Sequence, residues 1–324
     1  MIPVRILGTA TALPGRPIPT EEVAARALPG RDPAVVLAKT GIRTRHWAEP
    51  GALTADLAAT ALREAAVAAG IDVRDLRRVI LVTSTGGDYM GPATANSVIH
   101  ALGLDDRCDG FDLVNACMGF VSAFDVGARS VATGLHPVGI VSAELLTRFI
   151  RAEDPRPYVV FGDAAAAAVL GPGRPGEGIL GSFLRNDGAH NGTVFADQPM
   201  LTRKIEHAQF ALPNIKLVRI AVDALRRGAQ AVLDQCGEVI GDVDWVLPHQ
   251  PNGAMLDLIV DTFGVDRERV VPVVEEIGSV VSASIPASLD RLMRTRNVKP
   301  GDRILMIGVG SGLSYGAVLY RVAP

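Results

Sequence analysis

A pattern of helix and strand segments occurs twice along this chain, in the same order. Residues 55–70 carry apolar side chains at the spacing of one helix face, and the apolar strand 79–83 follows them. A second amphipathic helix over 218–236 precedes a second apolar strand over 245–248. A recurrence of this kind restricts the chain to folds that are built from two similar halves.

Two further pairs of segments extend the repeat. Residues 119–123 and 279–283 each open a helix, and strands follow at 138–142 and 304–307. Four segments in one order indicate an internal duplication. The stretch 183–213 is weakly patterned, and we expect it to form a lid, a binding loop or part of a dimer contact.

The repeat predicts an α/β fold. Alternating helices and apolar strands imply sheets whose faces are covered by helices. We expect two halves, residues 1–175 and 176–324, which pack against each other. Reactive groups in α/β sheets lie where strands end and helices begin, so Cys117, His249 and Ser279 are expected to converge in one crevice between the halves.

Composition narrows the classes of function. The 324 residues are 48% apolar and 21% charged, which indicates a compact globular protein. A net charge of −3 gives no basic surface for nucleic acid, so we expect a small-molecule or protein-borne substrate. No segment resembles a signal peptide or a membrane span. Cys108, Cys117 and Cys236 fit neither a disulfide framework nor a metal-ligand spacing, so we expect a cytoplasmic protein without a metal site.

Cys117 is a candidate nucleophile. It lies where a strand-like run gives way to a helix-like one, in Asp112-Leu113-Val114-Asn115-Ala116-Cys117-Met118-Gly119-Phe120. A thiol at a helix N-terminus meets unpaired N–H groups and the positive end of the helix dipole, so its thiolate is expected to be favoured. The alternative is a buried cysteine that only fills apolar space.

His249 is the candidate partner of this cysteine. It ends an apolar strand in Leu247-Pro248-His249-Gln250-Pro251-Asn252, where proline and asparagine predict a turn. A cysteine with a convergent histidine is the minimal apparatus for attack on a thioester through an acyl-enzyme. Backbone N–H groups beside Cys117 and in the turn Gly310-Ser311-Gly312 could stabilise the oxyanion.

Further motifs accompany this pair in one order along nearly the whole chain. They are Thr40-Gly41-Ile42-Arg43, Ala116-Cys117-Met118-Gly119-Phe120, Phe161-Gly162-Asp163, Pro248-His249-Gln250-Pro251-Asn252, Ser284-Ile285-Pro286 and Gly310-Ser311-Gly312. With them the chain resembles the β-ketoacyl-acyl-carrier-protein synthase III family of the thiolase superfamily.

The resemblance implies a fold and a chemistry. The fold would be the duplicated five-layer α/β/α/β/α thiolase fold, in a homodimer. Cys117 would take an acyl group from a coenzyme A or acyl-carrier-protein thioester, which is the substrate, with no resident cofactor or metal. The backbone N–H groups of Cys117 and Ser311 would form the oxyanion hole.

The resemblance also implies substrate-binding positions. Arg43 and Asn252 lie in the matched motifs, and Arg219 matches a basic docking position for the carrier protein. A second docking arginine of the family is replaced by Ala254. Gly91 aligns with the bulky residue that closes the acyl pocket in acetyl-selective members, so we expect room for a longer or functionalised acyl group.

Ser279 departs from the family pattern. It stands where an asparagine would complete a Cys-His-Asn triad and help to bind the enolate that forms as a malonyl thioester loses CO2. A serine hydroxyl is shorter and offers one donor. Losing one oxyanion donor costs on the order of 3 kcal/mol, or about a hundredfold in rate.

Several functions remain open at this point. The leading interpretation is a transfer enzyme of specialised lipid or polyketide metabolism, which passes the acyl group from Cys117 to a hydroxyl, amine or carbon acceptor with His249 as the base. Decarboxylative condensation with malonyl-carrier protein is the close alternative. A non-catalytic partner subunit ranks lower, because Cys117 and His249 are both present, and a cysteine hydrolase also ranks lower.

Overall fold

The computed structural model describes residues 1–197, 199–202 and 209–324. Its first sheet contains, in spatial order, β1 (Arg5–Ala12), β7 (Ala164–Gly171), β6 (Val138–Glu144), β4 (Arg78–Val82) and β5 (Asp109–Leu113). The β1/β7 and β7/β6 pairs are antiparallel, whereas β6, β4 and β5 run parallel.

The second sheet repeats this arrangement. Its spatial order is β8 (Gly178–Asn186), β13 (Ser314–Arg321), β12 (Arg303–Gly310) and β11 (Trp245–Pro248). The β8/β13 and β13/β12 pairs are antiparallel, and β12 and β11 are parallel. An isolated parallel bridge from Val246 to Val270 stands where the first sheet has β5. The predicted duplication is therefore present in both the order and the directions of the strands.

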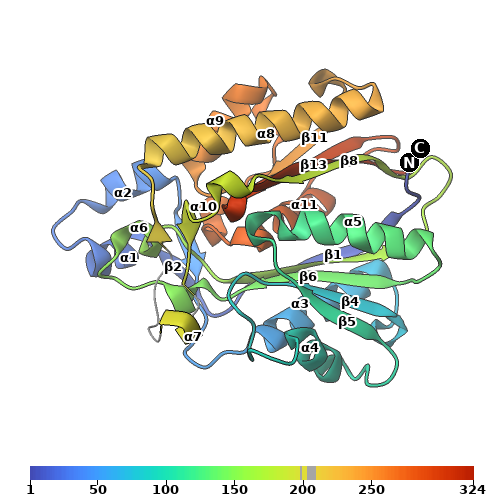
Figure 1. Ribbon diagram of the computed structural model, residues 1–324, viewed down its shortest axis with the longest axis horizontal. Coiled ribbons are helices and arrows are strands. Elements are labelled where there is room, and N and C mark those ends of the chain that lie inside the picture. Colours follow the sequence, from blue (N-terminus) through green and yellow to red (C-terminus); the bar gives the residue numbers. More distant parts are fainter. Residues whose placement is uncertain (198, 203–208) are drawn as a thin grey trace.

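The helices form three layers around the two sheets (Figure 1). α3 (Thr54–Ala69) and α4 (Thr94–Leu102) cover the outer face of the first sheet. α8 (Asn214–Cys236) and α9 (Gly253–Phe263) lie on the outer side of the second sheet. α5 (Gly119–Ala132) and α11 (Ser284–Thr295) lie between the sheets and contact both. The molecule therefore has the five layers, α/β/α/β/α, of a thiolase fold.

The main core fills the space between the sheets. It includes Phe120 and Phe124 of α5, Leu289 of α11, and Met306 and Val318 of the second sheet, all of them buried. On the other side of the first sheet, small side chains let the elements approach closely. An ideal Cβ on Gly8 of β1 would stand 2.3 Å from the backbone nitrogen of Ala69, so only glycine fits there.

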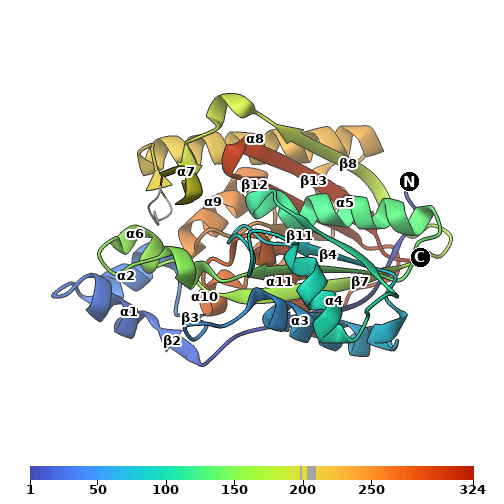
Figure 2. The same ribbon diagram turned by 60° about the horizontal axis from the view of Figure 1, so that its bottom comes forward.

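Shorter elements surround these layers. They are β2 (Pro17–Pro19), α1 (Thr20–Ala27), α2 (Pro33–Thr40), β3 (Thr44–His46), α6 (Pro155–Tyr158), β9 (Val194–Phe195), α7 (Pro199–Thr202), β10 (Gln209–Phe210) and α10 (Val274–Ile277). Figure 2 shows that the two chain ends lie on the same side of the molecule. No helix among the described residues is both long and apolar enough to span a membrane.

Two predicted boundaries are wrong. The helix expected to open at Ser279 begins at Ser284, because the 3-10 turn η7 (Val281–Ala283) comes first. The weakly patterned stretch 183–213 is not irregular at its start, since β8 runs on to Asn186 and pairs with β13. Residues 198 and 203–208 of that stretch lie outside the described residues.

Candidate active site

Cys117 lies in a tight turn beyond the carboxyl end of β5. The 3-10 turn η2 (Ala116–Met118) holds it, and α5 begins at the next residue, Gly119. Ala116, directly before the cysteine, has a positive φ of 45°. Backbone strain of this kind costs about 1–3 kcal/mol and is concentrated at functional sites. The residue as a whole is half-buried.

The Cys117 thiol is a neutral group, contrary to the expectation of a favoured thiolate. Burial and, to a smaller extent, the Glu144 carboxylate together raise its pKa to about 12. A hydrogen bond from the cysteine's own backbone N–H lowers this pKa by a smaller amount. Desolvation has the larger effect, because burial destabilises the thiolate by more than a hydrogen bond from one backbone N–H stabilises it. The thiol must therefore give its proton to a base during attack.

The glycine-rich end of β12 lies directly against the Cys117 turn. An ideal Cβ on Gly310 would stand 3.0 Å from the Cys117 backbone nitrogen, and one on Gly308 would stand 2.6 Å from the Met118 sulfur. Glycine at these positions lets the second half approach the nucleophile. The turn η8 (Ser311–Leu313) follows at once, so the backbones of Ser311 and Cys117 come close together. No loop or turn hydrogen bond among the described residues uses the N–H of either residue.

His249 lies between β11 and α9, at the strand-to-helix junction that the sequence predicts. Its backbone N–H donates to Ile307 O of β12 at 2.9 Å, and its side chain is buried. Burial lowers the pKa of the imidazole to about 4, although a hydrogen bond to the Val281 backbone partly offsets this shift. Nδ1 has no hydrogen-bond partner among the described residues. His249 is therefore a neutral imidazole at pH 7, which can accept a proton.

The turn η7 connects His249 to the cysteine. The backbone of Val281 in η7 interacts with the His249 imidazole through a hydrogen bond. The turn η7 also packs against η2, the turn that holds Cys117. The two predicted residues thus belong to one packed group of turns between the halves. A neutral histidine and a neutral thiol in one group of turns suit general-base catalysis, in which the proton moves as the sulfur attacks.

Ser279 lies at the edge of this group. Its backbone forms a parallel bridge with Phe161, through Ser279 N–H to Val160 O at 2.8 Å and Gly162 N–H to Ser279 O at 3.0 Å. The residue is 2% exposed. Its hydroxyl makes no hydrogen bond to the other described residues. The backbone at this position is fixed while the short side chain remains unengaged.

Glu144 and Ser282 form a buried polar pair that the sequence analysis missed. The Ser282 hydroxyl donates to Glu144 Oε1, and the Ser84 backbone N–H donates to Glu144 Oε2 at 2.9 Å. Both side chains are fully buried. Burial raises the pKa of Glu144 to about 7, against the effect of these hydrogen bonds. The only sign of this pair in the sequence is Glu144 itself, a charged residue at the end of the otherwise uncharged strand β6.

The four expected substrate-binding residues lie on four different segments. Arg43 is exposed and pairs with Glu275 at 3.2 Å, while Arg219 is exposed on α8. Asn252 caps α9, since its Oδ1 accepts from the Met255 backbone N–H at 2.8 Å. Gly91 lies in an exposed loop, and a Cβ there would meet nothing within 4 Å.

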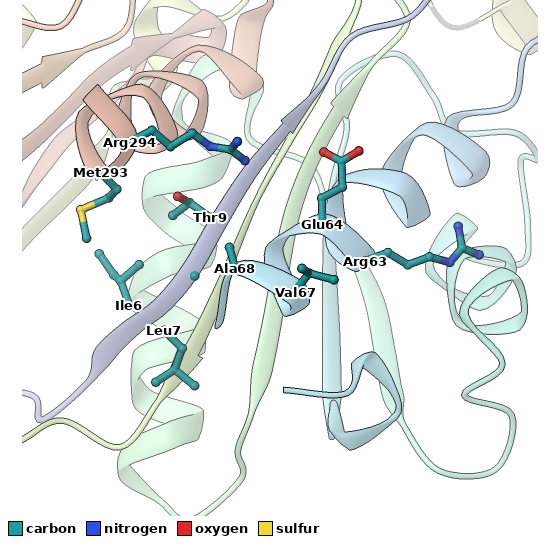
Figure 3. A pocket seen from close by; sticks show the side chains of 10 residues that line it. Ile6, Leu7, Thr9, Arg63, Glu64, Val67, Ala68, Met293 and Arg294 are labelled. Atoms are coloured by element: carbon teal, nitrogen blue, oxygen red, sulfur yellow. The ribbon is translucent and has the colours of Figure 1, made fainter. Parts of the chain in front are cut away.

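A surface hollow of about 670 Å3 lies away from these residues (Figure 3). Thr9 of β1, Arg63 and Val67 of α3, and Met293 and Arg294 of α11 are among the residues that line it. None of the candidate site residues is among them. Within the described part of the chain, no three His, Cys, Asp or Glu side chains are grouped as metal ligands.

Comparisons with known proteins identify the family of this chain. The family described as 3-oxoacyl-[acyl-carrier-protein (ACP)] synthase III matches residues 111–188, and its C-terminal counterpart matches 233–322. A β-ketoacyl-[acyl-carrier-protein] synthase III of Rhizorhabdus wittichii is 35% identical over 98% of both chains.

Two solved structures are also similar. The 3-oxoacyl-(acyl carrier protein) synthase III, FabH, of Pseudomonas aeruginosa PAO1 is 28% identical, with a TM-score of 0.90 and 99% of each chain covered. The priming β-ketosynthase of the R1128 polyketide biosynthetic pathway is 31% identical, with a TM-score of 0.90 over 99% of this chain and 96% of that one. This chain belongs to the β-ketoacyl-acyl-carrier-protein synthase III family and is an acyltransferase with a thiolase fold.

Proposed function

We propose that this enzyme takes an acyl group from a coenzyme A or carrier-protein thioester onto Cys117 and passes it to a second acceptor. The observation that carries the proposal is a neutral thiol and a neutral, buried imidazole in one packed group of turns, where no loop or turn hydrogen bond among the described residues uses the N–H of Cys117 or Ser311. Thiol, base and oxyanion donors are what acylation of a cysteine requires.

The first step is transfer of the acyl group to the enzyme. His249 takes the proton of Cys117 as the sulfur attacks the thioester carbonyl, and the N–H groups of Cys117 and Ser311 receive the oxyanion. The new S–C bond forms, the old S–C bond to the donor thiol breaks, and His249 returns the proton to the leaving sulfur. The products are acyl-Cys117 and free coenzyme A or carrier thiol.

The second step is transfer to a hydroxyl, an amine or an activated carbon. His249 takes the proton of the acceptor, and Cys117 leaves as the thiol. This step needs no decarboxylation, so it needs no second donor to an enolate. Ser279 supports this preference, because its short side chain is held on a fixed backbone and offers one donor where a carboxamide would extend further.

Decarboxylative condensation is the second candidate. It is favoured by the relatives at 34 and 35% identity, which are both named β-ketoacyl-[acyl-carrier-protein] synthase III. In that reaction malonyl-carrier protein would lose CO2 and its carbanion would attack acyl-Cys117. His249 would then be the main donor to the enolate, with Ser279 or a water in place of the usual amide.

The donor and the pathway are further parts of the proposal. Lys216, Arg219 and Arg226 are exposed along α8, and none of them forms a salt bridge with another residue that the structure describes. Such a basic face fits the acidic surface of a carrier protein or the phosphates of coenzyme A. The resemblance to a priming ketosynthase supports a place in specialised lipid or polyketide metabolism. Gly91, in its exposed loop, leaves space for a longer acyl group if a second copy places that loop near the site.

The two candidates differ in one product. Acyl-loaded enzyme is mixed with malonyl-carrier protein, and CO2 release is followed together with loss of the acyl group. The transfer proposal expects CO2 release no faster than that of malonyl-carrier protein without enzyme, and loss of the acyl group to hydroxyl or amine acceptors. Rapid release of CO2 with formation of a β-ketoacyl product would replace it with the condensing reaction.

A further inference from the structure

A chain of side-chain hydrogen bonds joins the Cys117 turn to the oxyanion turn. The Ser314 hydroxyl donates to Asn115 Oδ1 at 2.6 Å, and Asn186 Nδ2 donates to the same hydroxyl at 2.8 Å. Asn115 Nδ2 donates to Ser122 Oγ at 2.9 Å. Asn115 thereby uses both ends of its amide, one within its own half of the chain and one across to the other half.

The positions of these residues in the chain matter for the site. Asn115 directly precedes the turn η2 that holds Cys117, and Ser122 lies in the first turn of α5. Ser314 directly follows η8, the turn that begins with Ser311, and its hydroxyl lies 3.5 Å from Ser311 O. Side-chain hydrogen bonds therefore connect the nucleophile's turn with the turn of the second oxyanion donor.

The far side of the oxyanion turn is also fixed. Leu313 N–H donates to Asp187 O at 3.0 Å, and Asp187 N–H donates to Leu313 O at 2.8 Å. Asn186, the neighbour of Asp187, is the residue that donates to Ser314. Strand β8 thus holds the oxyanion turn from one side, while Asn115 holds it from the other.

We propose that Asn115 and Ser314 are positioning residues, which set the distance between the two backbone N–H groups of the oxyanion hole. The inference deepens the proposed function and rests on it, since an oxyanion forms only if Cys117 attacks a carbonyl. Neither side chain needs to touch the substrate. Their effect acts through the backbones of Cys117 and Ser311, which belong to different halves of the duplicated fold.

The expected effect is on the rate of acylation. A donor that is displaced by about 1 Å can cost up to about a hundredfold in rate. We therefore expect Asn115→Ala to slow acylation of Cys117 by about 10- to 100-fold, with KM for the thioester changed less than about threefold. Alkylation by iodoacetamide forms no oxyanion, so its rate is expected to stay within about threefold of the wild type.

The test compares these two reactions of the same thiol. Wild-type enzyme is screened with acetyl-, hexanoyl- and dodecanoyl-coenzyme A, and acylation by the fastest is followed by intact mass over time. The same measurement is made on Asn115→Ala, Ser314→Ala and the double variant. Asn96→Ala is the matched control, because Asn96 is exposed on α4 and bonds only to Ala93 O. Thermal unfolding of each variant reports on folding.

The outcomes separate the positioning role from the proposed function. Slow acylation with normal alkylation in both single variants, and no further loss in the double variant, supports the positioning pair. Acylation at the wild-type rate in Asn115→Ala overturns it, as does an equal loss of alkylation or an additive double variant. Absence of any Cys117 adduct in wild-type enzyme overturns the proposed function together with it.

Discussion

Ser282 occupies, in the second half of the chain, the position that Cys117 occupies in the first. Each residue follows a non-glycine residue of positive φ, 45° at Ala116 and 47° at Val281. Each lies in a 3-10 turn that leads into a helix of the central layer, and the two turns pack together. The duplication thus brings a thiol and a hydroxyl to matching places, and only the hydroxyl is bonded to Glu144.

Burial is the main reason why Cys117 holds its proton, and Glu144 adds to this effect. Its carboxylate raises the pKa of the thiol, so Glu144→Gln is expected to lower that pKa and to speed alkylation by iodoacetamide at pH 8 by several-fold. The measurement is the alkylation rate as a function of pH. Glu64→Gln, an exposed change on α3, is the control. An unchanged pH profile in Glu144→Gln would contradict the electrostatic effect.

His249 and Glu144 are expected to give stability opposite pH dependences. The pKa of Glu144, about 7, lies above its ordinary value of 4.5, so its contribution is full below pH 4.5 and is lost as the pH rises through 7. The pKa of His249, about 4, lies below 6.5, so its contribution is full above pH 6.5 and is lost as the pH falls through 4.

The two contributions partly cancel in the wild type between pH 4.5 and 6.5. Relative to the wild type, Glu144→Gln should gain free energy of unfolding more steeply as the pH rises across that window, and His249→Asn less steeply. The free energy of unfolding of each variant, relative to that of the wild type, should change across this window by on the order of 3 kcal/mol at most. Urea unfolding at several pH values measures it, and parallel curves for all three proteins would refute the assignment.

Gly310 is expected to accept no side chain. A Cβ at this position would press on the Cys117 backbone nitrogen, so Gly310→Ala should slow acylation by about tenfold or more and lower stability by about 1–3 kcal/mol. Gly241→Ala is the matched control, because its nearest neighbour would be 3.9 Å away. Acylation kinetics and urea unfolding give the two readouts. Normal acylation in Gly310→Ala would mean that the close approach of β12 does not shape the oxyanion hole.

Ser279 is expected to limit decarboxylation. Ser279→Asn supplies the amide donor that the family pattern has at this position, so CO2 release from malonyl-carrier protein should rise by at least about tenfold. Transfer to a hydroxyl or amine acceptor should change much less. Radiolabelled CO2 and the mass of the product distinguish the two reactions. If the variant releases CO2 no faster than the wild type, the missing amide is not what limits decarboxylation in this enzyme.

The duplicated fold could be predicted from the sequence because its elements have strong patterns. Helix α3 and strand β4, like helix α8 and strand β11, are long enough and apolar enough for periodicity to place them. The start of the second central helix could not be placed. A positive φ at Val281 is unusual for a β-branched residue, and no local signal announces the turn that it forms.

The electrostatics of the site could be predicted only in part. The position of Cys117 before a helix suggested a favoured thiolate, but burial and Glu144, which is distant in sequence, reverse that effect. His249 was found because its strand and turn are local signals. Asn115 and Ser314 were not found, since an asparagine two residues before a cysteine has a role only when the other half of the chain brings a partner to it.

The central claim is that Cys117 carries the acyl group. Intact mass of the purified enzyme after incubation with acyl-coenzyme A thioesters tests it most directly, with Cys117→Ala and Cys108→Ala measured in parallel. The account predicts one acyl adduct on the wild type and on Cys108→Ala, and none on Cys117→Ala. No adduct on the wild type, or an adduct that persists in Cys117→Ala, would contradict it.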